Sequence, residues 1–223
     1  MTQLEDLTLI HSVVKMPLMP LPVTSVAVKL KSGTVLISPG SQLTDEQLKN
    51  LSNVTDLVAS NALHSAGIPK ANAAHPNANV WGVPGLEKRK PEMKWTHVLK
   101  EGQWKYQEEL PAIFVKGAPA IKEVVFYHKP SKSLIVTDLC FNMTKVSGFG
   151  AWIILNLFGT YKKFGVSKFF ARYIKDKAAF ESSLKEILAY DFDKIIVSHG
   201  EIVTDNAKEK LRQAMALRGL NAN

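Results

Sequence analysis

Two histidines and one aspartate each follow a short apolar run of this chain. His64, Asp138 and His199 come just after runs of aliphatic, largely β-branched side chains. The three runs are Leu57–Ala59, Leu134–Val136 and Ile195–Val197. Imidazole nitrogens and carboxylate oxygens are atoms that bind zinc or ferrous iron and that move protons. These residue types therefore offer a metal site or an acid–base site.

Buried strands must bring these three residues together. Short apolar runs bounded by polar residues and glycine are typical of buried strands. In layered α/β folds, ligands gather just past the ends of such strands. We therefore expect His64, Asp138 and His199 to meet at one edge of a sheet.

The rest of the chain reads as a mixture of strands and helices. Alternating or continuous apolar runs predict strands at Leu7–Lys15, Ser25–Ser38 with a turn at 31–33, Asp56–Ser60, Asn79–Gly82, Ile113–Val115 and Glu123–His128. Thr44 and Gln47 form a capping box that predicts a short helix to about Leu51. Helical spacing predicts further helices at 177–190 and at 205–218, the last with Thr204 as its cap. Residues 84–91 are polar and turn-rich, which predicts an exposed connection. The pattern favours an α/β fold of two packed sheets with helices outside.

Length and composition set further limits. The 223 residues are 46% hydrophobic and 22% charged, so we expect one globular domain spanning 1–223. Cys140 is the lone cysteine, which excludes an intramolecular disulfide and a multi-cysteine zinc site. No secretory signal is visible at the first residues, and we expect a cytoplasmic protein. The net charge of +8 suits an anionic partner, but without a nucleic-acid motif we expect no specific nucleic acid.

Residues 144–176 form the least usual stretch. Gly148–Gly159 is apolar but well short of the roughly 20 residues that span a bilayer. Residues 161–174 then interleave aromatic and basic side chains. This segment could be an apolar and basic cap or lid over a pocket, a pair of helices packed on the core, or a peripheral membrane contact through 148–174. A lid would favour a substrate with an apolar portion.

The order of these landmarks resembles the metallo-β-lactamase superfamily. The similar segments are Val35–Gly40, His64–Gly67 with Ala74–Val80 following, Lys132–Asp138 and Ile195–Gly200. The resemblance covers about Leu7 to Asn206. It implies a four-layer αββα sandwich and a metal-dependent hydrolase that acts on a small-molecule substrate.

The resemblance is incomplete at the metal ligands. The superfamily signature is histidine, any residue, histidine, any residue, aspartate, histidine. If His64 takes the last place, Asn61 and Leu63 stand where ligands belong, and Gly117–Pro119 lacks a further histidine. His64, Asp138 and His199 match three of the four ligands of one metal site. The resemblance thus implies at most one zinc or iron ion, and a site with no metal remains the alternative.

Two functions follow from this reading. A single metal ion would activate water for attack on an ester, thioester, amide or phosphoester. Alternatively, the chain is a non-catalytic descendant of the fold that binds a small molecule, a membrane surface or a protein partner.

Four further residues are pocket candidates. Ser60, Asn61 and Ser65 lie beside His64 in sequence and offer hydrogen-bond donors. Cys140 would share a face with Asp138 if that strand continued, which would make it a further ligand or nucleophile. A buried apolar role for Cys140 is the alternative.

Overall fold

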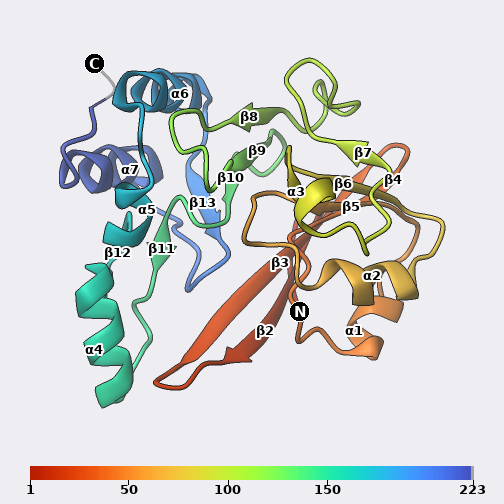
Figure 1. Cartoon of the computed structure of the whole chain (residues 1–223), viewed down its shortest axis with the longest axis horizontal. Helices are drawn as coiled ribbons and strands as arrows, with labels where there is room; N and C mark the ends of the chain where they lie inside the picture. The colour runs from red at the N-terminus through yellow and green to blue at the C-terminus, as the bar shows by residue number, and fades with distance from the viewer. Residues whose placement is uncertain (222–223) are drawn as a thin grey trace.

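Two β-sheets pack face to face in the computed structural model, which describes residues 1–221 (Figure 1). The larger sheet has the order β1-β2-β3-β4-β5-β6-β7, and the smaller has the order β13-β10-β9-β8. The strands of the larger sheet are β1 (Thr2–Leu4), β2 (Leu7–Lys15), β3 (Pro20–Leu30), β4 (Gly33–Ile37), β5 (Val54–Ala59), β6 (Asn79–Gly82) and β7 (His97–Val98). Those of the smaller sheet are β8 (Ala112–Phe114), β9 (Val124–His128), β10 (Ser133–Val136) and β13 (Lys194–Val197). A separate short pair joins β11 (Phe141–Asn142) to β12 (Phe164–Gly165).

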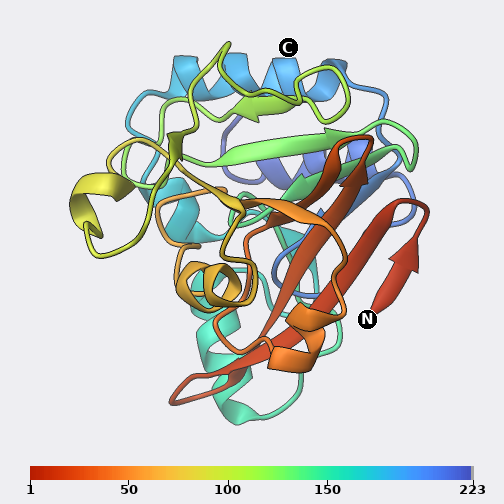
Figure 2. The same cartoon turned by 90° about the vertical axis from the view of Figure 1, so that its right-hand side faces the viewer.

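Helices cover the outer faces of both sheets, as Figures 1 and 2 show from two directions. The helices are α1 (Asp45–Lys49), α2 (Ile68–Ala74), α3 (Leu86–Arg89), α4 (Phe149–Phe158), α5 (Lys168–Arg172), α6 (Lys177–Ala189) and α7 (Ala207–Ala216). Helices α6 and α7 lie outside the smaller sheet, and α1 and α2 lie outside the larger one. The expected four-layer αββα sandwich is therefore confirmed.

Alternation along β10 explains how the layers hold together. Leu134 and Val136 face α6 and α7, whereas Ile135 between them faces the larger sheet. Side chains of a strand point alternately to its two faces, so an all-apolar strand is buried on both sides. Leu57 and Val58 of β5 belong to the same hydrophobic cluster as Ile135, and both are fully buried. The apolar runs that precede the candidate residues are thus central strands.

The hairpin of β2 and β3 extends past the body of the sandwich and runs beside α4 (Figures 1 and 2). Its strands pair from Leu7 opposite Val28 to Lys15 opposite Pro20, so the turn lies at 16–19. A Cβ atom at Gly150 would overlap the carbonyl group of Leu18 in this turn. Glycine at the start of α4 therefore lets the helix lie directly against the end of the hairpin.

Several local expectations differ from the structure. Strand β3 begins at Pro20 rather than at Ser25, because the hairpin continues past the sheet as a two-stranded ribbon. Residues 84–91 include helix α3, whose Leu86 is buried in the core. Thr204 does not cap the last helix; α7 starts after Asn206, which has a left-handed backbone and no side-chain cap. The capping box of Thr44 and Gln47 is present as expected.

Candidate functional site

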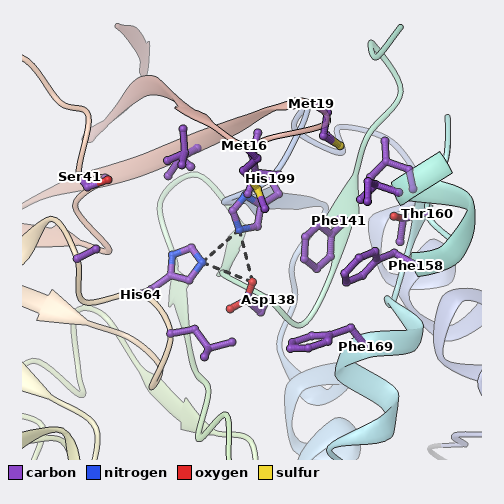
Figure 3. Close-up of a pocket in the computed structure, with 18 of the residues that line it drawn as sticks. Met16, Met19, Ser41, His64, Asp138, Phe141, Phe158, Thr160, Phe169 and His199 are labelled. Carbon is purple, nitrogen blue, oxygen red and sulfur yellow. Dashed lines mark hydrogen bonds and ion pairs between the residues drawn. The ribbon is translucent and has the colours of Figure 1, made fainter. Parts of the chain in front are cut away.

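His64, Asp138 and His199 converge at one edge of the sandwich (Figure 3). Asp138 and His199 lie just past β10 and β13, which are parallel neighbours with Val136 opposite Val197. His64 comes from the turn after β5, in the facing sheet. The structure thus brings together the three residues expected to meet, and it does so through two different sheets.

The three ligand atoms form a nearly equilateral triangle. His64 Nε2 lies 3.2 Å from His199 Nε2. Each Nε2 lies 3.4 Å from the same atom, Asp138 Oδ1. Ligands that bind a tetrahedral zinc ion at ~2.0–2.1 Å are about 3.3–3.4 Å apart, so the spacing of this donor set fits a metal ion.

A backbone carbonyl fixes the His199 ring. His199 Nδ1 lies 2.9 Å from the carbonyl oxygen of Pro22, which only accepts hydrogen bonds, so Nδ1–H is the donor. Phe141 also stacks on the ring, with an interplanar angle of 13°. Nε2 is then the ring nitrogen that faces His64 and Asp138. Outer contacts of this kind orient metal-binding histidines.

Asn61 connects Asp138 to the loop of His64. Asn61 Nδ2 donates to Asp138 Oδ2 at 2.8 Å, which leaves Oδ1 facing the two histidines. Asn61 Oδ1 accepts from the backbone N–H groups of Leu63 and His64, both at 2.8 Å. One amide side chain therefore holds two of the three candidate ligands in place.

The carboxylate and the imidazoles alter each other's ionisation. Burial alone would raise the pKa of Asp138, but the charge of His64 and hydrogen bonds from both histidines outweigh burial and lower it. Burial alone would lower the pKa of His64, yet the neighbouring Asp138 carboxylate raises it overall. Asp138 is thus held as a carboxylate, the form that binds metal ions.

Glu123 is a buried residue that sequence reasoning missed. Its carboxylate accepts hydrogen bonds from the backbone N–H groups of Thr137, Asp138 and Leu139 and, at 3.3 Å, from Asn61 Nδ2. Burial, together with the nearby Asp138 charge, raises the pKa of Glu123 to about 7 despite these donors. Glu123 therefore fixes the backbone that carries Asp138. In the sequence, the signal for a buried acid would have been that Glu123 stands directly before the apolar run of β9.

A cavity of about 400 Å³ opens over the three residues. Its lining includes His64, Asp138, His199, Leu63 and Ser41, and it is otherwise mainly apolar: Val14, Met16, Met19, Leu21, Val23, Pro39, Gly40, Ala66, Gly67, Phe141, Ile154, Leu155, Phe158, Thr160 and Phe169. The walls come from the β2–β3 hairpin and from α4 and α5, as Figure 3 shows. The hydroxyl of Thr160 on the far wall is buried and has no hydrogen-bond partner within residues 1–221.

The four further pocket candidates lie outside this lining. Ser60 and Asn61 are buried behind Asp138, where Ser60 Oγ bonds to Ser38 Oγ at 2.6 Å and to Thr137 Oγ1 at 3.3 Å. Ser65 is fully buried as well. Ser60 and Asn61 thus support the site from behind rather than border the cavity.

Cys140 does not share a strand face with Asp138. Strand β10 ends at Val136, so Asp138 and Cys140 both lie in the following loop. The thiol is fully buried in the core beneath α6 and α7, and burial raises its pKa well above the usual value. This is the environment of an inert apolar cysteine, not of a nucleophile.

Comparisons with known proteins identify the fold. No protein-family model and no curated protein sequence matches the chain. Among solved structures, a metallo-β-lactamase from Pontibacter korlensis matches with a TM-score of 0.67 and 16% identity, over 98% of this chain and 97% of that one. A metallo-β-lactamase from Erythrobacter litoralis matches with a TM-score of 0.68 and 15% identity, over 97% and 95%. One from Hirschia baltica matches at 0.63 and 13%, over 98% and 96%. The chain therefore has the metallo-β-lactamase fold.

Proposed function

We propose that this protein is a hydrolase with one metal ion, held by His64, Asp138 and His199. Its substrate would be an ester, thioester, amide or phosphoester with an apolar portion. The observation that carries the proposal is the triangle of ligand atoms, with edges of 3.2–3.4 Å, at the floor of an apolar cavity. A zinc or ferrous ion bound there would act as a Lewis acid and make water nucleophilic near neutral pH.

The protein's own residues would orient the ligands of the site. Pro22 and Phe141 keep Nε2 of His199 directed at the floor of the cavity. Asn61 keeps Asp138 Oδ1 directed at the same point. Such preorganisation raises metal affinity because the ligands lose little freedom on binding.

The cavity walls support the choice of substrate class. Phe158, Phe169 and Met19 offer apolar surface beside the three ligands. The partnerless hydroxyl of Thr160 would hydrogen-bond to a polar atom of the substrate away from the bond that breaks. An acyl or aryl ester with a single polar substituent suits this lining.

Metal content and hydrolysis, measured on the same samples, test the proposal. Protein purified without chelator or nickel would be assayed by mass spectrometry for zinc, iron and manganese, and with aryl esters, thioesters and phosphoesters. We expect about one equivalent of metal and measurable turnover, both lost in His199→Ala. His75→Ala, which removes a histidine outside the cavity, is the matched control and would keep both. No metal after reconstitution with these ions would refute the proposal.

One observation favours a second function, that of a non-catalytic binding protein. Within the described residues that line the cavity, the ionisable side chains are His64, Asp138 and His199 alone, so no separate general base is present. Leu63 takes part of the lining instead. A fluorescent apolar ligand that binds equally well to wild type and His199→Ala, with no hydrolysis of any ester, would establish this alternative.

A further inference from the structure

We propose that the end of the β2–β3 hairpin and the start of α4 dock together on an anionic lipid bilayer. We call this surface the apolar tip and define it as Met16, Leu18, Phe149 and Trp152. Their exposed fractions are 47%, 56%, 76% and 50%. Both views of the molecule show the hairpin end and the N-terminal end of α4 projecting side by side from the sandwich (Figures 1 and 2).

The apolar tip is a fixed surface rather than four separate side chains. Phe149 and Trp152 stack, with ring centroids 5.9 Å apart and an interplanar angle of 15°. Gly150 lies close to the Leu18 carbonyl group, so the hairpin end and the start of the helix are direct neighbours. Contiguous exposed apolar surface of this kind marks an interaction site, whereas scattered exposed apolar residues do not.

Helix α4 carries apolar residues on its solvent side as well as on its core side. Ala151 and Leu155 are buried against the body. Phe149, Trp152 and Leu157 lie on the outer face and are exposed. Surface helices normally place polar residues outward, so this outer face needs an apolar environment. No helix among residues 1–221 is long and apolar enough to cross a membrane, so the contact would be interfacial.

The charges of the two segments that build the apolar tip favour an anionic lipid surface as the partner. Neither Leu7–Thr44 nor Leu139–Lys175, the two segments that build the tip, contains an aspartate or glutamate. Lys15 directly precedes Met16 and Lys145 precedes α4, whereas Lys162, Lys163, Lys168, Arg172 and Lys175 follow the C-terminal end of α4, where Leu157 is also exposed. Lys145 is paired with Glu201 at 2.8 Å. Aromatic residues flanked by lysines are typical of segments that bind anionic membranes.

The apolar tip is continuous with the cavity. Met16 both belongs to the tip and lines the cavity, and the neighbouring Met19 also lines it. A protein docked through this tip would therefore place one wall of its cavity next to the acyl chains of the lipid. Docking itself involves no metal ligand, so it stands independently of the hydrolase proposal.

Vesicle co-sedimentation tests the proposal. The full chain would be mixed with vesicles of phosphatidylcholine alone and of equal parts phosphatidylcholine and phosphatidylglycerol. We expect binding to the anionic vesicles that weakens with salt. The double variant Phe149→Ser/Trp152→Ser should bind at least about tenfold more weakly, because it buries much less apolar surface in the bilayer. Lys162→Glu/Lys163→Glu should also weaken binding, by about fivefold or more for each lysine.

Matched variants keep the test specific. Leu217→Ser removes an exposed apolar residue directly after α7, and Lys88→Glu/Arg89→Glu reverses two charges at α3; both variants should bind like wild type. His199→Ala should also bind like wild type, which separates this result from the metal assay. Absence of binding to anionic vesicles would overturn the proposal. So would a tip variant that binds normally, or self-association of the wild type that the tip variants abolish without any vesicle binding.

Discussion

Asp56 and Asp138 are both buried carboxylates beside central strands, but their surroundings differ. Asp56 accepts from Trp81 Nε1 at 2.7 Å and Tyr106 OH at 2.6 Å, and it pairs with Lys105 at 2.8 Å. Asp138 has one oxygen bonded to Asn61, while the other faces two imidazole nitrogens and an open cavity. A buried acid is therefore not by itself a functional site. The distinguishing feature is a carboxylate oxygen that borders an open cavity and faces two imidazole nitrogens, which could bind the same metal ion.

Asp56→Ala is expected to have the largest effect on stability. The change leaves the buried Trp81 Nε1–H and Tyr106 hydroxyl groups without their acceptor, at about 1–3 kcal/mol each, whereas the exposed Lys105 ammonium group can turn to water. Urea unfolding would measure the loss of unfolding free energy. Asp193→Ala, at an exposed ion pair with Lys194, is the control and should change little. The metal content of folded Asp56→Ala should equal that of wild type. A loss of metal would contradict the conclusion that Asp56 is structural and Asp138 is the ligand.

Asp138→Asn is expected to show the opposite pattern. Its amide oxygen can still accept from Asn61, but a neutral group replaces a carboxylate that the histidines stabilise, so the unfolding free energy should fall by about 1–2 kcal/mol, less than in Asp56→Ala. The metal affinity should fall at least about a hundredfold, because an amide group replaces a charged ligand. Competition with a zinc chelator measures the affinity. Retained affinity together with a large loss of stability would mean that Asp138 is a structural residue like Asp56.

The stability of Tyr106→Phe at different pH values tests how the hydrogen bonds to Asp56 contribute to folding. Burial alone would raise the pKa of Asp56, but hydrogen bonds from Lys105, Tyr106 and Trp81 outweigh burial and lower it below the ordinary 3.8. The stability that these bonds contribute is therefore present above about pH 4 and is lost as the pH falls through the folded-state pKa. Near pH 7 the variant should lose about 1.5–3 kcal/mol, the range for a hydrogen bond to a charged group. Unfolding curves at several acid pH values should show the deficit shrinking; a constant deficit would contradict the account.

Asn61→Ala is expected to have the smallest of these effects. The variant keeps all three ligands but frees Asp138 and the backbone of His64. Loss of such an outer contact lowers metal affinity by about 10–100-fold. Chelator competition would measure it, with Asn72→Ala on α2 as the control. An unchanged affinity would show that Asn61 does not position the ligands.

Sequence reasoning reached the strands and the three converging residues because both depend on local patterns. Continuous apolar runs before Asp138 and His199 indicate central strands whatever the rest of the fold is. The extent of β3 and the cap of α7 were wrong because pairing along the hairpin and a left-handed Asn206 override local signals. Cys140 was misplaced because the sequence does not show that β10 ends at Val136.

The contacts that support the site could not be predicted from the sequence. Pro22 orients His199 across a large separation in the chain, and Glu123 acts by accepting from the backbone of another segment. Neither contact leaves a periodic or spaced pattern. Asn61 was expected in the pocket lining, but in the structure it lies behind Asp138.

Calorimetric titration of chelator-treated protein with zinc tests the central claim most directly. Asp138 Oδ1 faces both histidines and can bind a metal ion, whereas Oδ2 accepts a hydrogen bond from Asn61. The arrangement therefore suits one ion. We predict a stoichiometry of one zinc ion per chain, absent in His199→Ala and retained in Asp56→Ala. No binding to the wild type, or binding that persists in His199→Ala, would contradict the account.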